Sequence, residues 1–570
     1  MAAGVLFAVL ATLNAGGYRY GASDQAFYIP AVLHQLDPTL FPRDWAMLGA
    51  QGRYFLVDEI AAGLVRLTGW PLPIWFAMAQ GATLAALFAG AWRLGRLVLD
   101  SPWALAAWLA ALTLRHRIAK TGANTLEGYF HPRMLVFGLG LMALADVLQG
   151  RRWRPVMLTL AAGALHPTTA AMFLAIVVVT IVVAEPRAHR PAAVAAAGVV
   201  VAALGLLASG AGPDLTPMDA GWRALVATKD YTFPTRWSAS TWMVNLAGPA
   251  VLGAAAWRRA RDGRLTRAER GVVAGGLLLV AGFVASLPLI AAGVPLAVQL
   301  QTSRAFWPVE CLAVLFLVWA LIDRPLRQGP NRGAHALAAL LVAVSVARAA
   351  YVGLVEHPDR PTFALDLPDD DWVHALTWVR TATPPDAFVV ADPGHAWKPG
   401  MGTAVRIAAV RDTYLEETKD VAMAMYSRDA AHAVAARIGA TARFDTLSVA
   451  ELRALAPGDG PSLLVTGRAL DLPVLHRAGA VAVYRLAPRR RRHAGARRAI
   501  LPANAGPPGR RSPWPLPFRA ATSPACSPLA APLPCSPIRS SPASTSPPPT
   551  SCPRGRRPVS RSGRACASSS

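Results

Sequence analysis

The sequence predicts a mainly α-helical, polytopic membrane protein: a bundle of transmembrane helices, then a small extracytoplasmic α/β domain, then a disordered tail. Hydrophobic residues make up 54% of the chain and charged residues only 16%, and the apolar residues form long blocks separated by short, arginine-containing loops. A soluble globular chain carries about a quarter charged residues, so these blocks indicate membrane spans. After residue 354 strand and helix patterns alternate, and after residue 488 the composition changes abruptly.

The bundle, residues 1–354, holds about eleven candidate spans. We predict them near 1–16, 73–92, 102–114, 133–149, 155–168, 169–184, 191–209, 242–257, 271–292, 307–322 and 335–354. Arginines fill every second loop, and acids collect in the loops between, which predicts a cytoplasmic N-terminus and an external segment after the last span. The net charge of +24 therefore reflects membrane orientation and a basic tail, and no RNA-binding or zinc-finger pattern points to nucleic acid.

The first external loop, residues 17–72, is long, and long loops in compact proteins tend to be functional. Within it, Tyr54 to Trp70 has the pattern of an amphipathic helix that lies in the membrane interface. Asp58 and Glu59 fall on the face of this helix that we expect to be solvated.

Residues 355–488 are predicted to form the α/β domain. Asp370 can cap a helix, and Ser448 to Glu451 forms a capping box that opens another. Apolar runs at 387–391, 463–466 and 481–486 predict strands. Strands that alternate with helices indicate a small α/β fold, which we interpret as a cover or an acceptor-recognition module.

Residues 489–570 contain 15 Arg, 17 Pro and no Asp, Glu or Lys. Such a segment cannot bury a core and is predicted to be disordered, and it also has the character of out-of-frame translation of a GC-rich gene. Neither interpretation gives it a catalytic role. Four of the five cysteines lie here, so the body offers neither a disulfide framework nor a Cys/His metal site.

The stretch that carries chemistry is GYRYGASDQAFYIP, from Gly17 to Pro30, directly after the first span. Here Asp24 is followed by Gln25 and Tyr28. The stretch resembles the GT-C superfamily of membrane glycosyltransferases, which use polyprenyl-phosphate-linked sugars and place a catalytic acid in the first external loop. The order of span, acidic loop, span bundle and external domain extends the resemblance over residues 1–488.

The resemblance implies that Asp24 is the general base that takes a proton from an acceptor hydroxyl, with inversion at the anomeric carbon. Gln25 stands where many members have a second carboxylate, so a two-carboxylate metal site is not expected, no cofactor is assigned, and a divalent metal stays open. The alternative for Asp24 is a cap of the helix from Gln25 to His34.

A lipid phosphate leaving group needs positive charge near the outer membrane surface. Arg304, in QTSRAFWP, and Arg133, in EGYFHPRM, each open a span on the predicted external side. The alternative for both is an ordinary interfacial anchor.

Four more residues are candidates for substrate binding. His131 and His166 each precede a proline near the outer end of a span, where histidine is often functional, although a satisfied helix-end histidine is the alternative. Glu127 is a second acid or a partner for a nearby arginine. Asp44, in FPRDW, is expected to bind acceptor hydroxyls or to cap the next turn.

The resemblance favours transfer of a hexosyl or pentosyl group from a polyprenyl-phosphate donor to an envelope glycan, lipid or protein. The expected place is the outer face of a bacterial cytoplasmic membrane, with membrane lipids and no nucleic acid as further partners. Two alternatives remain: a catalytically inactive GT-C-like scaffold, and a transporter or lipid-handling protein. A transporter would be expected to show internal repeats, and the sequence has no clear one.

Overall fold

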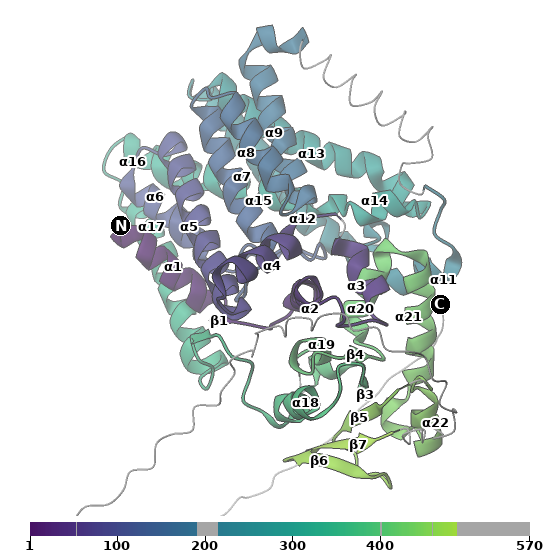
Figure 1. The fold of residues 1–570 in the computed structure, drawn as a ribbon. Helices are drawn as coiled ribbons and strands as arrows, with labels where there is room; N and C mark the ends of the chain where they lie inside the picture. Colours follow the sequence, from purple (N-terminus) through teal and green to yellow (C-terminus); the bar gives the residue numbers. More distant parts are fainter. Residues whose placement is uncertain (53, 191–214, 399–401, 459, 487–570) are drawn as a thin grey trace, which may run out of the picture. The chain divides into compact units, whose positions relative to one another are not determined.

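The computed structural model describes residues 1–52, 54–190, 215–398, 402–458 and 460–486 (Figure 1). By compactness the chain divides into Met1–Arg492 and His493–Ser570, and all the elements below belong to the first unit. The predicted span at 191–209 and the predicted tail at 489–570 lie outside the described residues.

A helix overlaps each predicted span within the described residues. These helices are α1 (Ala2–Asn14), α5 (Leu72–Val98), α6 (Pro102–Thr113), α7 (Pro132–Leu148), α8 (Trp153–Gly163), α9 (Pro167–Ala184), α12 (Ala239–Arg261), α13 (Arg267–Ala291), α15 (Phe306–Val318) with the π-helical η4 (Trp319–Asp323), and α17 (Arg332–Tyr351) with the π-helical η5 (Val352–Glu356). Shorter pieces are η1 (Pro186–Ala188), α11 (Ala220–Val226), η2 (Pro234–Arg236), α14 (Pro295–Gln299), η3 (Thr302–Ala305) and α16 (Arg324–Arg327).

Five helical segments of the described chain have the length and apolar character needed to cross a membrane. They are Leu72–Val98, Pro167–Ala184, Arg267–Ala291, Pro295–Arg327 and Arg332–Glu356, while α1 and α6 are apolar but shorter. The chain is therefore described as a multi-pass membrane protein, and the total of eleven spans stays a prediction.

Glycines let the bundle helices approach closely. A Cβ on Gly90 of α5 would lie 2.8 Å from the carbonyl oxygen of Gly138 in α7. A Cβ on Gly275 of α13 would lie 2.9 Å from the Cα of Ile176 in α9. Small residues at such contacts are typical of helix packing in membranes, where close van der Waals contact replaces the hydrophobic driving force.

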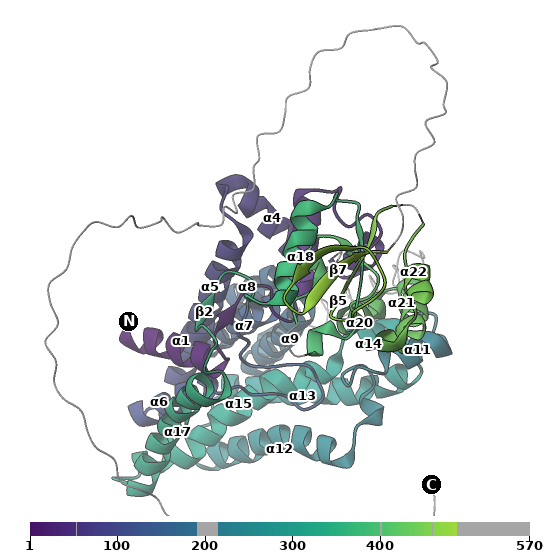
Figure 2. The same ribbon diagram turned by 90° about the horizontal axis from the view of Figure 1, so that it is seen from below.

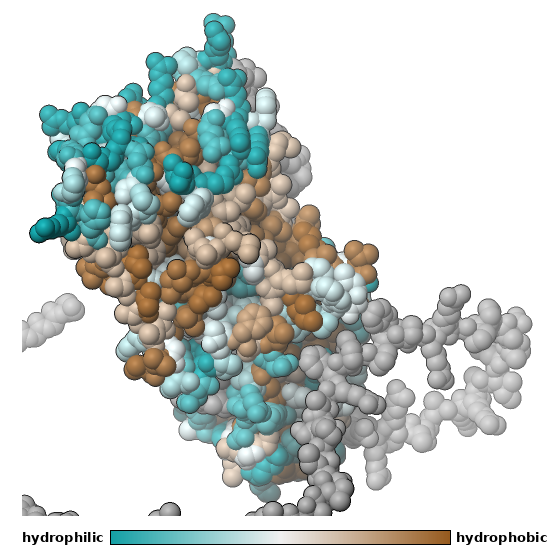
Figure 3. All heavy atoms as spheres, turned by 90° about the vertical axis from the view of Figure 1, so that its left-hand side faces the viewer, coloured by the Kyte–Doolittle hydropathy of each residue, from teal (hydrophilic) through white to brown (hydrophobic). Residues whose placement is uncertain are grey.

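Hydrophobic residues form a band across one face of the molecule, with hydrophilic residues above and below it (Figure 3). Large apolar side chains are also exposed on α12, α13 and α17, among them Met243, Leu278 and Leu340. An apolar surface of this kind is unfavourable in water but matches the hydrocarbon layer of a bilayer.

The first loop folds into α2 (Gln25–Leu36), α3 (Trp45–Gly52) and α4 (Val57–Thr68). The predicted amphipathic helix is α4, and Leu56, Ile60 and Leu67 are exposed along it. Asp58 differs from the prediction, because its side chain is buried, with 4% of the residue exposed. The hydrophobic periodicity marks one apolar face, but the opposite face is covered by the rest of the fold at Asp58 while Glu59 stays exposed.

The α/β domain contains a five-stranded sheet in the order β4-β3-β5-β7-β6. The predicted strands are confirmed as β3 (Phe388–Ala391), β5 (Ser462–Thr466) and β7 (Val481–Arg485), and the sheet also includes β4 (Asp412–Thr413) and β6 (Val474–Ala478). Strand β3 is parallel to β4 and β5, whereas β7 runs antiparallel to β5 and β6. Two residues are too few for a pattern to predict β4.

The helices of this domain are α18 (Asp371–Ala382), η6 (His395–Trp397), α19 (Val405–Ala408), α20 (Glu417–Met423), η7 (Ala424–Tyr426), α21 (Arg428–Thr441), η8 (Phe444–Thr446) and α22 (Val449–Ala454). Both predicted caps are confirmed: the Asp370 side chain accepts a hydrogen bond from Val373 N, and Ser448 and Glu451 form a capping box. Helix α18 packs against β6 and β7 (Figure 2).

Two features join the domain to the first loop. Strand β1 (Tyr18–Arg19) pairs in parallel with β2 (Phe363–Ala364), a segment that follows the last bundle helix. Helix α19 packs on α2, and α20 packs on α3 (Figure 1). The loop that follows the first helix is therefore fixed between the bundle and the α/β domain.

The alternation of basic and acidic loops predicts which segments face outward. With its own cysteines replaced, the protein should react with an impermeant thiol reagent in intact cells through a cysteine at the exposed position Asp369, and not at Gly263 in the loop between α12 and α13. Both positions should react after the membrane is permeabilised. Labelling of Gly263→Cys alone in intact cells would show that the topology is the reverse of the predicted one.

Candidate functional site

Asp24 stands at a sharp turn between the first helix and α2. Gly21 and Ser23 both have left-handed backbone conformations, with φ of 76° and 48°. The Gln25 side chain closes this turn: its Oε1 accepts from Gly21 N at 2.7 Å and its Nε2 donates to Phe130 O at 3.3 Å. Gln25 is completely buried, so the substrate-binding role expected for it is wrong, and it shapes the loop instead.

The Asp24 carboxylate does not cap the helix that follows it. Asp24 occupies the N-cap position of α2, but its side chain accepts no capping hydrogen bond. Its oxygens face basic side chains instead: Lys419 Nζ lies 2.8 Å from Oδ1, while His131 Nε2 and Arg133 lie 3.4 Å and 3.9 Å from Oδ2. About a quarter of the side chain, 26%, stays exposed. The cap alternative therefore does not explain this residue.

His131 is both a helix cap and a neighbour of Asp24. Its Nδ1 accepts from the backbone N–H of Arg133 at 3.3 Å, which opens α7. A neutral ring that accepts at Nδ1 carries its proton on Nε2, the atom that faces Asp24. Tyr28 packs edge-on against the same ring, with 5.5 Å between centroids. Tyr28 is itself buried, with 3% of the residue exposed, and its contact supports the His131 ring.

Glu127 forms an ion pair with Arg133, and both side chains are buried. Asn124 donates a further hydrogen bond to Glu127 at 3.2 Å. The alternative that Glu127 pairs with a nearby arginine is thus confirmed. The pair fixes Arg133 between two carboxylates, because Arg133 also approaches Asp24.

Arg304, in η3, is a further cation of the site. Its guanidinium lies over the ring of Tyr231 at 5.8 Å and its Nε donates to Thr121 O at 3.4 Å. Within the described residues it makes no ion pair, although Asp24, Arg133 and His166 lie within electrostatic reach. His166 caps α9 by accepting from Thr169 N, and its ring lies 6.3 Å from that of His131.

The charges around Asp24 set its protonation. Burial acts to raise the pKa of the Asp24 carboxyl, but Lys419, the hydrogen bond from His131 and Arg133 together hold that pKa well below its usual range. For His131, burial and the charge of Arg133 lower the pKa of the ring in spite of the nearby carboxylates. At neutral pH the site therefore contains an ionised Asp24 beside a neutral His131.

Asp44 lies apart from this cluster. Its carboxylate is buried and accepts from Arg406 Nε at 2.8 Å and from Thr413 N at 3.0 Å. With 1% of the residue exposed, it cannot meet an acceptor hydroxyl. The substrate-binding role expected for Asp44 is wrong, because the α/β domain covers the loop at this point.

Six of the clustered residues were predicted from the sequence, whereas Lys419, which comes from α20, was not. The chain has only four lysines, Lys120, Lys229, Lys398 and Lys419, and all four lie in segments predicted to be external, so their placement does not single out Lys419. Lys229 Nζ donates to the carbonyl of Thr418, next to Lys419. Tyr231 and Tyr426, from two other segments, are also within electrostatic reach of Arg304.

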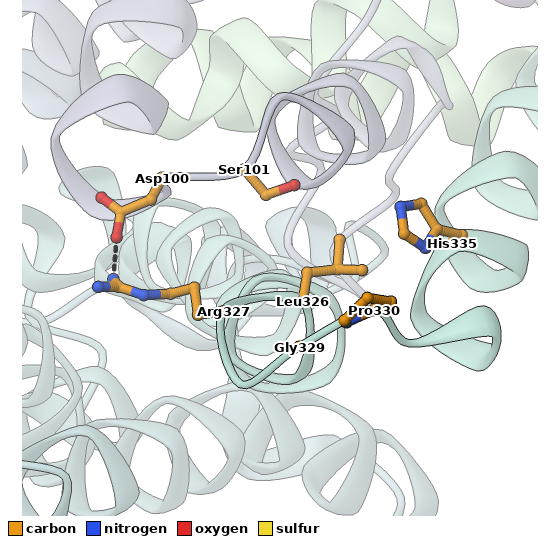
Figure 4. Close-up of a pocket in the computed structure, with 7 residues that line it drawn as sticks. All are labelled: Asp100, Ser101, Leu326, Arg327, Gly329, Pro330 and His335. Atoms are coloured by element: carbon orange, nitrogen blue, oxygen red, sulfur yellow. Dashed lines mark ion pairs between the residues drawn. The ribbon is translucent and has the colours of Figure 1, made fainter.

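No group of three His, Cys, Asp or Glu side chains suited to hold a metal ion occurs in the described part of the chain. One pocket lies elsewhere, where the loop between α5 and α6 meets the loop between α16 and α17 (Figure 4). Its lining includes Ser101, His335 and the ion pair of Asp100 with Arg327. None of the residues around Asp24 lines it.

No family model and no curated protein matches the chain. The chain matches several solved structures. One is the arabinofuranosyltransferase AftD from Mycobacteria, with a TM-score of 0.38, 15% identity, and coverage of 72% of this chain and 31% of the other. The second is the oligosaccharyltransferase of Archaeoglobus fulgidus in its apo form, with a TM-score of 0.37, 13% identity, and coverage of 72% and 64%.

The chain spans less than two thirds of the length of either protein. The function proposed below is drawn from the residues around Asp24.

The burial of Asp58 predicts how the stability of the protein changes with pH. Burial, with the charge of Glu59 added, raises the pKa of Asp58 to about 8. Between pH 4 and pH 8 the folded protein then keeps a proton that the unfolded chain has lost. The free energy of unfolding falls as pH rises through this window, by up to about 1.4 kcal/mol per pH unit.

Asp58→Asn should remove this loss. In thermal unfolding of the detergent-solubilised protein, the melting temperature of the variant relative to wild type should be higher at pH 8 than at pH 5. Glu59→Gln, at the exposed neighbour, is the matched control and should keep most of the pH dependence. An Asp58→Asn effect that is equal at both pH values would show that Asp58 is ionised throughout.

Proposed function

We propose that the chain is a membrane glycosyltransferase that transfers a sugar from a polyprenyl-phosphate donor to a cell-envelope acceptor, at the outer face of the cytoplasmic membrane. The observation that carries the proposal is the state of Asp24. Its carboxylate does not serve as a helix cap, and it remains partly exposed while it faces Lys419 of one segment and Arg133 with the His131 ring of another. Strongly perturbed carboxyls in such surroundings are typical of active sites.

The reaction needs a base on one side and positive charge on the other. Asp24 accepts the proton of the acceptor hydroxyl as its oxygen forms a bond to the anomeric carbon. The bond from that carbon to the phosphate oxygen breaks, and the electron pair leaves with the lipid phosphate. Attack opposite to the leaving group inverts the anomeric centre.

Arg304 is the cation best suited to the leaving phosphate. Arg133 is already engaged by Glu127 and Asp24, whereas Arg304 has no carboxylate partner among the described residues. A guanidinium can donate two parallel hydrogen bonds to a phosphate, and its charge stabilises the negative charge that develops as the sugar leaves. Tyr231 holds the Arg304 guanidinium over its ring.

Glu127 and His131 keep this arrangement in place. Glu127 fixes Arg133, and Arg133 together with the Nε2–H of His131 orients Asp24. The neutral imidazole donates a hydrogen bond without adding a full charge, so Asp24 keeps more basicity than beside a third cation.

The central test replaces Asp24. Asp24→Asn is nearly isosteric but cannot accept a proton, so transfer should fall by roughly 10²- to 10⁴-fold while the protein still folds. The measurement is transfer by the purified protein, with a panel of polyprenyl-phosphate hexoses and pentoses as donors.

Asp230→Asn is the matched control, because Asp230 also pairs with a lysine, Lys120, at 2.8 Å but lies outside the cluster. This control should keep full activity. Turnover that survives Asp24→Asn would show that Asp24 is not the base, and turnover that never appears with any donor would favour the inactive scaffold.

A further inference from the structure

Lys419 belongs to the α/β domain but contacts the residue proposed as the base. Its Nζ lies 2.8 Å from Asp24 Oδ1 and 5.1 Å from the centre of the Phe27 ring, and only 12% of its side chain is exposed. The two paired residues are 395 positions apart in sequence. The domain therefore supplies part of the site, beyond the covering role expected from the sequence.

A buried ion-pair network fixes the helix that presents Lys419. Arg406, which is fully buried, binds Glu416 at 3.0 Å and Asp420 at 2.6 Å, and these residues flank Lys419. Arg406 also binds Asp44 of the first loop at 2.8 Å. Helix α20 and the loop are thus held to the same guanidinium, which places Lys419 opposite Asp24.

The pairing leaves Asp24 poorly suited to act as a base. An ammonium at 2.8 Å occupies Oδ1, and a carboxylate held by a close cation is a weaker proton acceptor. Lysine, however, has a compact charge on a flexible stem and can exchange one anion for another. A lipid phosphate bound beside Arg304 would bring a second anion within reach of the same cluster.

We propose that Lys419 is a shared cation: it holds Asp24 while the site is free of donor and moves to the donor phosphate on binding, which releases Asp24 to accept the acceptor's proton. This inference rests on the proposed function and adds donor binding as the event that frees its base. No covalent step is added, since one ion pair replaces another. The enzyme would then activate its base only when the donor is present.

The first test measures binding of a polyprenyl monophosphate without sugar to the full-length protein. Lys419→Met should weaken binding roughly tenfold to a hundredfold, and Lys419→Arg should restore most of it. Lys398→Met is the matched control, because Lys398 is a lysine of the same domain that pairs with Asp392 and Asp445; it should bind as wild type. Undiminished binding by Lys419→Met would overturn the proposal. Competition by inorganic phosphate as strong as that by the lipid would overturn a lipid headgroup as the ligand.

The second test separates a shared cation from a structural one. The charged and titratable groups around Asp24 and Lys419 include His131, Arg133, Glu127, Arg304, Lys229, Tyr28, Tyr129 and Tyr231. In Lys419→Met the acid limb of kcat/KM, which reports the free enzyme, should move to higher pH, while that of kcat should stay in place. Limbs that move together would show that Lys419 never leaves Asp24, which contradicts the proposal. Weakened lipid binding with no transfer from any donor would support the shared cation and refute the transferase.

Discussion

The Arg406 guanidinium links the first loop to the α/β domain, and the site around Asp24 depends on it. It is completely buried and contacts three carboxylates, those of Asp44, Glu416 and Asp420. Burying a charge is costly unless partners satisfy it, and removing one partner of such a pair leaves the other uncompensated. The network therefore tolerates little displacement of α20 relative to the loop. This geometry, together with the packing of α19 on α2 and of α20 on α3, sets Lys419 against Asp24.

The cluster around Asp24 combines opposite charges at a desolvation cost that stability alone does not explain. Lys419, Arg133 and Arg304 outnumber Asp24 and Glu127, and His131 is held neutral. A hydrophobic contact would join loop and domain at lower desolvation cost. Excess positive charge at the end of a membrane bundle instead suits an anionic group carried by a lipid. Among these three cations, Arg304 is the one that has no carboxylate partner within the described residues.

Much of the fold could be predicted because hydropathy acts locally. A helix overlaps each predicted span within the described residues, the three predicted strands formed, and the caps at Asp370 and Ser448 formed as their side chains dictate. Positions set by tertiary packing could not be predicted in this way. The amphipathic pattern of α4 gave no sign that Asp58 would be covered, and the two-residue strand β4 has no pattern of its own.

The residues of the site also fall into those that local sequence predicts and those that tertiary packing decides. Asp24, Glu127, His131, Arg133, His166 and Arg304 were found because each lies near the predicted outer end of a span, and one membrane surface brings such ends together. Gln25 and Asp44 belong to the same first loop as Asp24, yet their hydrogen bonds turn them inward. Lys419 was missed because nothing in the α/β sequence says which short helix faces the bundle.

An experimental structure of the Asp24→Asn variant with bound polyprenyl monophosphate would show which cations hold the lipid phosphate. This substitution removes the proposed base but keeps the cations. The account predicts the phosphate in contact with both Arg304 and Lys419, with the Lys419 ammonium turned away from position 24. A phosphate bound elsewhere, for example against Arg327 in the pocket of Figure 4, with Lys419 still directed at position 24, would contradict it.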